Sequence, residues 1–337
     1  MKRAFAAVAR CLDEFVSIAV VNYCTRRRLT KAFSSLVLTS GFLLTATSGA
    51  QTQAAKLDDP LLRSIGGESA AQWTVPQSPV RVYGNTWLIG FTEMNVVLVD
   101  TGNGLIVVDA GVPQGVRDIE ANIRSLGYEL RDVKYILNTE AHYDHGGGIA
   151  ALARDTGAVV VASELSAIEL EQGHNSADDP QSGELSDFPA VKHVQRIKDG
   201  EHLQLGNTQV TAYATPGHTA GSMSWGWTSC AGGVCYPVVF AASLSPISVE
   251  GYRFADPVHH AVVEQFRRSY EQLRKMPCEI LLAGHPVHFD GAAKLNRLKA
   301  DPDSNAFREP NACRVFADAQ EKRFETRLKS EAATKSK

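Results

Sequence analysis

The fold is decided by the stretch Asn138-Thr139-Glu140-Ala141-His142-Tyr143-Asp144-His145-Gly146-Gly147-Gly148. It follows an apolar run of strand character at 133–137 and precedes a run with helical periodicity that starts near residue 148. Imidazoles and carboxylates packed this closely can surround a cation only where the backbone is irregular, and three glycines allow an irregular backbone and close approach. The stretch therefore predicts a metal-binding loop between a strand and a helix, against the alternative of an ordinary polar turn.

Two further histidines lie in matching contexts farther along the chain. His218 stands in Thr-Pro-Gly-His-Thr-Ala-Gly at 215–221, and His285 stands in Leu-Leu-Ala-Gly-His-Pro at 281–286. Each follows a run of strand character and a glycine, which places the side chain at the rim of a sheet. Together with His142, Asp144 and His145 they predict a site for two metal ions.

The regions around these motifs alternate between strand and helix patterns. Strands are expected at 80–83, 86–89, 95–99, 105–109, 133–137, 158–161, 208–214, 223–227, 237–241 and 280–283. Helices are expected at 117–126, 148–156 and 164–171, at a segment with Val262, Phe266, Ser269 and Leu273 on one face, and at 314–333, while 173–189 is expected to be a loop. Two strand-rich blocks, each followed by helices, predict two packed sheets with helices outside.

Composition narrows the class of protein. The 337 residues are 44% apolar and 21% charged, which excludes collagen-like, wholly disordered and polytopic membrane proteins. Residues 1–50 hold seven of the 34 Lys/Arg and two of the 37 Asp/Glu, so the rest of the chain carries about eight excess negative charges. Such a body lacks the basic surface that nucleic-acid binding needs, and no nucleic-acid partner is expected.

The first 50 residues are typical of an export signal. Basic residues at 26–31 precede the largely apolar run 32–46, with small residues at Ser48 and Ala50 where cleavage is expected. The apolar run is shorter than the roughly 20 residues that span a bilayer, so a retained anchor is the less favoured alternative. We expect an N-terminal extension and signal peptide at 1–50 and a single domain at 51–337. The motif leaves open whether the general secretory or the twin-arginine machinery exports the chain. The mature protein would be periplasmic or secreted, free of the membrane.

Four cysteines remain after such cleavage: Cys230, Cys235, Cys278 and Cys313. In an oxidising compartment they can form two disulfides in three connectivities. Only four residues separate Cys230 from Cys235, and two of them are glycines, so a turn there favours that pair and leaves Cys278 with Cys313. Free thiols or a zinc knuckle are the alternatives, the second disfavoured because no CxxC accompanies the cysteines.

The chain from about residue 73 to 327 resembles the metallo-β-lactamase superfamily, and specifically its subclass B3. The run 139–147 matches the family's HxHxDH loop except at the first histidine, where Glu140 stands, and 107–111 matches the strand before it. The resemblance implies an α/β four-layer αββα sandwich. It also implies one zinc held by Glu140, His142 and His218, and a second held by Asp144, His145 and His285.

Residues 240–245 carry the subclass assignment. Lactonases and glyoxalase-II-like members of the superfamily have a metal-bridging aspartate near Ala242, and other lactamase subclasses have a cysteine ligand where Ser243 stands. The cysteine pairs 230–235 and 278–313 also match disulfides of the B3 subclass. By the same resemblance Ser243 and Ser245 would hold a water or the substrate carboxylate, with ordinary strand-end hydroxyls as the alternative.

The resulting functional hypothesis is an exported zinc-dependent β-lactamase, a hydrolase of the β-lactam amide that would confer antibiotic resistance. Zinc-bound hydroxide would attack the carbonyl while Asp144 orients the water, and a small-molecule β-lactam would be the partner. If Glu140 turned away from the metal, only two histidines would remain and the first zinc site would be weak. The alternatives are another zinc hydrolase of the superfamily, acting on a lactone, thioester or phosphoester, and an exported zinc-binding protein with little catalysis.

The remaining histidines and Trp73 lie outside these motifs, so the sequence says less about their roles. His174 lies in the acidic loop and would border the cleft, and Trp73 would either line the cleft rim or pack on the sandwich. Surface positions are expected for the remaining histidines, which are His193, His202, His259, His260 and His288.

Overall fold

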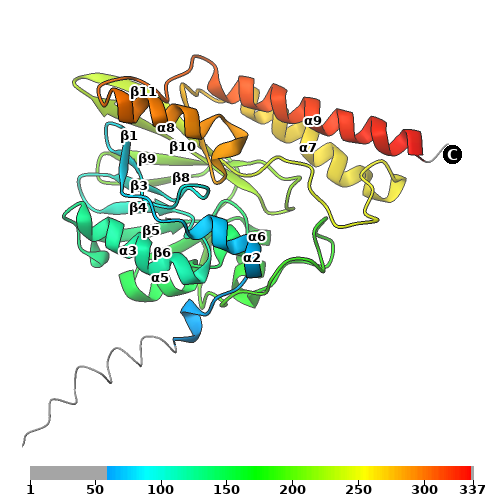
Figure 1. Cartoon of the computed structure of the whole chain (residues 1–337), viewed down its shortest axis with the longest axis horizontal. Helices are drawn as coiled ribbons and strands as arrows, with labels where there is room; N and C mark the ends of the chain where they lie inside the picture. Colours follow the sequence, from blue (N-terminus) through cyan, green and yellow to red (C-terminus); the bar gives the residue numbers. More distant parts are fainter. Residues whose placement is uncertain (1–58, 335–337) are drawn as a thin grey trace, which may run out of the picture. The chain divides into compact units, whose positions relative to one another are not determined.

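The computed structural model describes residues 59–334. The expected signal segment at 1–50 lies outside the described residues. Within the described part, two β-sheets lie between outer layers of helices, which Figure 1 shows as α3 and α5 on one side and α7 and α9 on the other. This is the four-layer αββα sandwich that the resemblance implies.

The first sheet of the described chain has seven strands in sequence order. They are β1 (Val80–Tyr83), β2 (Thr86–Leu88), β3 (Val97–Asp100), β4 (Leu105–Val108), β5 (Val133–Leu137), β6 (Val159–Ala162) and β7 (Val194–Arg196). The pairs from β1 to β4 are antiparallel and those from β4 to β7 are parallel. The parallel part requires crossovers, which the helices between β4 and β7 supply.

The second sheet has five strands in the described residues, in the order β12-β11-β10-β9-β8. They are β8 (His202–Leu205), β9 (Thr208–Ala214), β10 (Met223–Ala231), β11 (Val234–Ala241) and β12 (Ile280–Ala283). β8 to β11 pair antiparallel, and β12 lies parallel to β11. As a result β9, β11 and β12 all run in the same direction.

The helices cover the outer faces of the two sheets. The α-helices are α2 (Gly67–Ala71), α3 (Val116–Ser125), α4 (Tyr143–Gly146), α5 (Ile149–Thr156), α6 (Glu164–Gln172), α7 (His260–Lys275), α8 (Gly291–Ala300) and α9 (Ala312–Thr334). Short 3-10 turns occur at η1 (Pro60–Leu62), η2 (Gln72–Thr74), η3 (Pro113–Gly115), η4 (Leu130–Asp132), η5 (Pro257–His259) and η6 (Pro286–His288).

Alternation along the central strands produces two hydrophobic cores. In β4, Ile106 and Val108 belong to the core between the sheets, while Leu105 and Val107 belong to the core beneath α3 and α5. Successive side chains of a strand point to opposite faces, so a strand buried on both sides is apolar throughout. The inter-sheet core extends through Phe266 of α7 to the C-terminal helix α9.

Several details differ from the sequence expectations. Strands β7 and β8 and helix α8 were not predicted, because their patterns are short and largely polar. Strands β10 and β11 are longer than expected and meet in a two-residue turn at Gly232 and Gly233, whose φ angles of 57° and 81° suit a hairpin turn that glycine favours. In α7 the buried valine is Val263 instead of the expected Val262, which is only half-buried.

Both expected disulfides are present in the described chain. Cys230 and Cys235 face each other across the end of the β10–β11 hairpin, and Cys278 before β12 is bonded to Cys313 in the first turn of α9. The second bond fastens the C-terminal helix to the second sheet. Among residues 59–334, no helix has both the length and the apolar character needed to cross a membrane.

Candidate metal centre

The predicted site residues meet where strands of both sheets end. Asp109 follows β4, the 138–148 stretch follows β5, His218 follows β9, Ser243 follows β11 and His285 follows β12. Because β4 is parallel to β5, and β9, β11 and β12 share one direction, each sheet brings its strand ends to one edge. Hydrogen bonds join the two edges.

Two of these bonds lead from β10 to the central stretch. The Met223 N–H donates to the carbonyl of Thr139 at 2.8 Å, and the Trp225 Nε1–H donates to the carbonyl of Asn138 at 3.1 Å. A third interaction fixes the end of β12, where the buried Asn95 side chain donates to the carbonyl of Ala283 at 2.7 Å. The two sheets therefore hold the site as one rigid edge.

The site differs from the predicted irregular loop in one respect. Asp144 and His145 lie on α4, a single helical turn that begins directly after His142. Glycines are still needed around it, because a Cβ on Gly284 would meet Cε1 of His145 at 2.4 Å. The close approach expected of glycine thus occurs at Gly284 as well as in the Gly146–Gly148 run.

Glu140 is fully buried and points into the site. Its Oε2 accepts a hydrogen bond from the Ser243 N–H at 3.0 Å and one from the Ser222 hydroxyl at 3.5 Å. Its Oε1 lies 2.9 Å from Nε2 of His145, within ion-pair distance, and 3.9 Å from Nε2 of His218. One carboxylate oxygen is therefore anchored and the other is left facing imidazole nitrogens.

The buried His145 is oriented from behind by Asp109. Its Nδ1 lies 2.9 Å from Oδ2 of Asp109, which also accepts the Thr139 hydroxyl at 2.6 Å. Asp109 has φ of 61°, a conformation that a non-glycine residue rarely adopts and that costs energy. The strain brings the carboxylate behind the His145 ring, so that Nε2 faces Glu140 and Asp144.

His142 and His218 lie edge to face, with ring centroids 4.9 Å apart. Nε2 of His142 lies 3.0 Å from Oδ2 of Asp179, and Nδ1 of His218 lies 2.8 Å from the carbonyl oxygen of Ser245. In each ring one nitrogen is held by an acceptor, and the other nitrogen of His218, Nε2, lies 3.3 Å from Nε2 of Gln181.

Asp144 lies between the remaining histidines. Its Oδ2 is 3.0 Å from Nε2 of His285 and 3.7 Å from Nε2 of His145. The ring of the half-buried Trp73 packs 5.6 Å from the His285 ring and 5.8 Å from the Tyr143 ring. Trp73 therefore packs on the sandwich beside the site, so its two expected positions coincide.

Burial and neighbouring opposite charges shift the pKa values of the ionisable groups in opposite directions. Burial by itself raises the pKa of Glu140, but the charges of His145 and His218 hold it well below its usual range. Burial lowers the pKa of His145, yet the carboxylates of Glu140 and Asp144 raise it well above its usual value. For Asp144, burial is likewise outweighed by His145 and His285, and its pKa is lowered. The carboxylates are thus maintained as anions that need positive charge nearby.

Two sets of potential ligands can be distinguished among the described residues. Glu140, His142 and His218 offer one ligand atom each within 4.8 Å of one another, and so do Asp144, His145 and His285. Glu140 is anchored through Oε2 and directs Oε1 toward the histidines of the site. Nitrogen and oxygen donors in sets of three are the chemistry of a catalytic zinc site with an open position, so these residues fit zinc.

Ser243 and Ser245 contribute through their backbones. The Ser243 N–H binds Glu140 and the Ser245 carbonyl accepts from His218, whereas the Ser245 hydroxyl is buried without a hydrogen-bond partner. Asp179 and Gln181 were not predicted as site residues. Nε2 of Gln181 lies 3.3 Å from Nε2 of His218. Their only sequence signal is a place in the polar 173–189 loop, which also holds the exposed His174.

The other histidines lie mostly at the surface, as expected. His193, His202 and His260 are exposed, and His259 stacks on Tyr252 with ring centroids 3.9 Å apart. His288 differs, because it is half-buried and its ring lies 5.7 Å from that of His285. Burial lowers the pKa of His288 to about 4, with a further contribution from His285.

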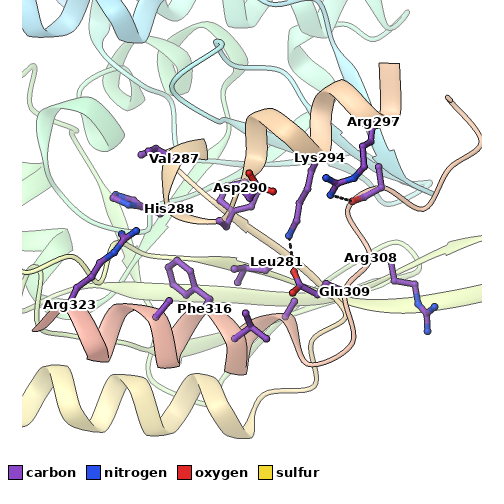
Figure 2. A pocket seen from close by; sticks show the side chains of 15 residues that line it. Leu281, Val287, His288, Asp290, Lys294, Arg297, Arg308, Glu309, Phe316 and Arg323 are labelled. Carbon is purple, nitrogen blue, oxygen red and sulfur yellow. Dashed lines mark hydrogen bonds and ion pairs between the residues drawn. The ribbon is translucent and has the colours of Figure 1, made fainter. Parts of the chain in front are cut away.

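His288 also lines a cavity of about 560 Å³ bordered by α8 and α9. Figure 2 shows Lys294 reaching toward Glu309, to which it is paired at 3.2 Å, and Arg323 extending from α9 toward His288. The residues that line this cavity include no member of the two ligand sets. It is therefore a separate hollow behind the His285 segment.

Comparison with known families matches residues 89–285 to the family described as the metallo-beta-lactamase superfamily. Among solved structures, one described as the first B3 metallo-beta-lactamase with an active site glutamic acid is 44% identical, with a TM-score of 0.75, and covers 82% of this chain and 99% of its own. The Rm3 metallo-beta-lactamase is 38% identical, with a TM-score of 0.76, and covers 80% of this chain and 100% of its own.

Matches to curated proteins are shorter. The uncharacterized protein YobT of Bacillus subtilis is 35% identical over 152 residues, which are 42% of this chain and 62% of YobT. The hydroxyacylglutathione hydrolase of Methylococcus capsulatus is 28% identical over 145 residues, which are 43% of this chain and 44% of that protein. The chain thus spans less than two thirds of these two relatives.

Proposed function

The chain belongs to the metallo-beta-lactamase superfamily, in its subclass B3, and from this premise we propose that it is a zinc-dependent β-lactamase. The observation that carries the proposal is the buried Glu140, whose Oε1 lies 2.9 Å from Nε2 of His145 and 3.9 Å from Nε2 of His218. A relative described as a B3 enzyme with an active site glutamic acid matches over 99% of its length. Glutamate in this site is therefore compatible with β-lactamase chemistry.

The proposed metal centre holds two zinc ions, one on Glu140, His142 and His218 and one on Asp144, His145 and His285. When bound, zinc would polarise the lactam carbonyl and lower the pKa of a water to about 7. The protein supplies the orientation of the ligands, since Asp109, Asp179 and the Ser245 carbonyl each hold a ring nitrogen that faces away from its ligand set.

Other residues would act directly on the substrate or the water. Asp144 orients the attacking water through its carboxylate, which its lowered pKa keeps unprotonated at neutral pH. Ser243 and Ser245 would bind a water or the carboxylate that β-lactams carry. The buried Ser245 hydroxyl, which has no hydrogen-bond partner, supports that role.

The second candidate is a thioester hydrolase, favoured by the curated relative named hydroxyacylglutathione hydrolase. The fully buried Ala242 argues against it, because in such enzymes the family resemblance places a metal-bridging aspartate near this position. Alanine offers no ligand atom. The β-lactamase proposal therefore ranks first, ahead of lactone, thioester or phosphoester hydrolysis and of zinc binding without catalysis.

Hydrolysis of a chromogenic cephalosporin by the purified zinc-loaded protein tests the proposal, alongside a thioester and a lactone. We expect cephalosporin turnover that Asp144→Asn or His285→Ala reduces at least a hundredfold with the fold retained. His193→Ala, which changes an exposed histidine, should keep parental turnover. Preferential hydrolysis of the thioester, or zinc binding without any turnover, would contradict the β-lactamase proposal.

We also propose that residues 51–337 form one exported domain that acts in the periplasm or outside the cell. The two disulfides support this, because such bonds persist in oxidising compartments. N-terminal sequencing of the mature protein should find Gln51 first. Recovery of the full chain from the cytoplasm with all cysteines reduced would contradict it.

A further inference from the structure

Asp179 is a buried carboxylate in the loop between α6 and β7. It is only 7% exposed, and its Oδ2 lies 3.0 Å from Nε2 of His142. Its other oxygen, Oδ1, accepts the Gln181 N–H at 2.8 Å. Both carboxylate oxygens therefore have a partner, and one of those partners is a proposed zinc ligand.

We propose that Asp179 is a positioning residue that fixes the proton of His142 on Nε2 and turns Nδ1 toward the first ligand set. A carboxylate only accepts hydrogen bonds, so the nitrogen facing it must carry a proton. A neutral imidazole has one proton, and the lone pair then lies on Nδ1, where a metal can bind. The inference rests on the proposed zinc centre, but it does not depend on which substrate is hydrolysed.

The loop that carries Asp179 is itself fastened at several points. The Ser176 N–H donates to Oε1 of the buried Glu169 at 3.0 Å, and the Asp179 N–H donates to the carbonyl of Ser176 at 3.1 Å. On the other side, the Val249 N–H donates to the carbonyl of Pro180 at 2.9 Å. These bonds place the carboxylate from two separate segments of the chain.

The arrangement repeats at two other histidines of the site. Nδ1 of His145 faces Asp109 at 2.9 Å, and Nδ1 of His218 faces the Ser245 carbonyl at 2.8 Å. In both rings the acceptor occupies one nitrogen and leaves Nε2 directed at Glu140. His142 is held through the opposite nitrogen, Nε2, by Asp179 of the 173–189 loop.

The test compares Asp179→Asn with Asp178→Asn. Both variants remove one negative charge from the same loop, but Asp178 is exposed. In Asp179→Asn the new side-chain amide can donate to Nε2 of His142, which favours the proton on Nδ1 and blocks the ligand atom. With zinc alone as the probe, in competition with a chromophoric chelator, we expect Asp179→Asn to weaken the first site 10- to 100-fold and Asp178→Asn to stay within twofold.

Three outcomes would overturn the assignment. Parental zinc affinity in Asp179→Asn would show that the carboxylate does not position His142, and equal losses in both variants would assign the effect to loop charge. Circular dichroism accompanies the titration to detect any change in folding. A further test needs no variant at Asp179 and uses nitrogen-15 spectra of the zinc-loaded parent chain. They should find the His142 proton on Nε2, and a proton on Nδ1 contradicts the proposal.

The same measurements separate this inference from the proposed function. A parent chain that binds two zinc ions, loses affinity in Asp179→Asn and hydrolyses no β-lactam would retain the positioning role of Asp179 and exclude the β-lactamase. A parent chain that hydrolyses β-lactams while Asp179→Asn keeps its full zinc affinity would retain the β-lactamase proposal and exclude the positioning role of Asp179.

Discussion

Glu140 illustrates how a single side chain can be adapted to an unusual position. Its Oε2 is anchored by the Ser243 N–H and the Ser222 hydroxyl, while Oε1 faces the histidines. A neutral imidazole that bound a metal through one nitrogen would carry a proton on the other, so it could not also accept from the Ser243 N–H. The surroundings therefore suit a carboxylate, and we expect a well-formed first site, in contrast to the weak site that the sequence alone left open.

Glu140→Gln tests the charge at this position with almost no change in shape. The amide keeps an oxygen but loses the negative charge that compensates the cation, and a neutral amide is a poor zinc ligand. We expect at least a tenfold loss of zinc affinity at the first site, measured by chelator competition, with an unchanged circular dichroism spectrum. Glu93→Gln, at an exposed position, is the control. Two zinc ions bound at parental affinity in Glu140→Gln would show that the carboxylate is not a ligand.

At the scale of elements, the packing of α3 against α5 contains a buried acid outside the candidate metal centre. Glu120 of α3 is 8% exposed and lies 3.4 Å from Nη1 of Arg124 on the same helix. Burial, reinforced by hydrogen bonding and charge from Asp155 of α5, raises the pKa of Glu120 to about 7. Arg124 offsets only part of this effect.

This raised pKa predicts a pH-dependent stability. The folded chain keeps the Glu120 proton between about pH 4.5 and 7 while the unfolded chain releases it, so the free energy of unfolding falls as the pH rises through that window. Relative to the parent, Glu120→Gln should gain about 1 to 2 kcal/mol between pH 5 and pH 8, measured by urea denaturation. A constant difference between the two chains across this range would refute the prediction.

The disulfides act at the same scale but enclose loops of different length. Cys278 and Cys313 are 35 residues apart, whereas Cys230 and Cys235 are five apart. Loop-closure entropy predicts that Cys278→Ser with Cys313→Ser lowers the free energy of unfolding by about 4 kcal/mol, and the pair at 230 and 235 by about 2 kcal/mol. Denaturation of the two double variants measures the order, and a larger loss from the short loop would be inconsistent with this account.

For the whole molecule, the metal centre joins two sheets that otherwise share a hydrophobic core. The ligand sets draw on both sheets, with Glu140 and His142 after β5, His218 after β9 and His285 after β12. A ligand that binds only the folded state stabilises every segment that contributes to its site. Zinc should therefore stabilise the described domain globally.

Removal of zinc is expected to lower the melting temperature. At a zinc concentration about 100-fold above the dissociation constant, binding contributes about 2.7 kcal/mol, which corresponds to about 4 to 5 °C for a chain of this size. Calorimetry with and without a chelator measures the shift, and readdition of zinc should restore it. Asp144→Asn should show a smaller shift, and a chelator effect of equal size in that variant would argue against its role as a ligand.

The sequence by itself predicted the class of fold, and it named the residues that the structure brings together as two sets of potential ligands. Short apolar runs located the central strands, since a strand that is buried on both faces is apolar throughout. The motif at 138–148 and the glycine-flanked His218 and His285 predicted a metal centre, because these residue types have few other uses in such contexts. Short polar strands such as β7 carried too little signal to be predicted.

Only the tertiary structure decided how each ligand is oriented. Nothing in the sequence relates Asp179 to His142 or Ser243 to Glu140, because these partners are 37 and 103 residues apart and meet through loops that local periodicity does not describe. The orientation of a buried polar side chain depends on which neighbouring donors and acceptors still lack a hydrogen-bond partner. That set of neighbours exists only once the two sheets have packed and brought their strand ends to a common edge.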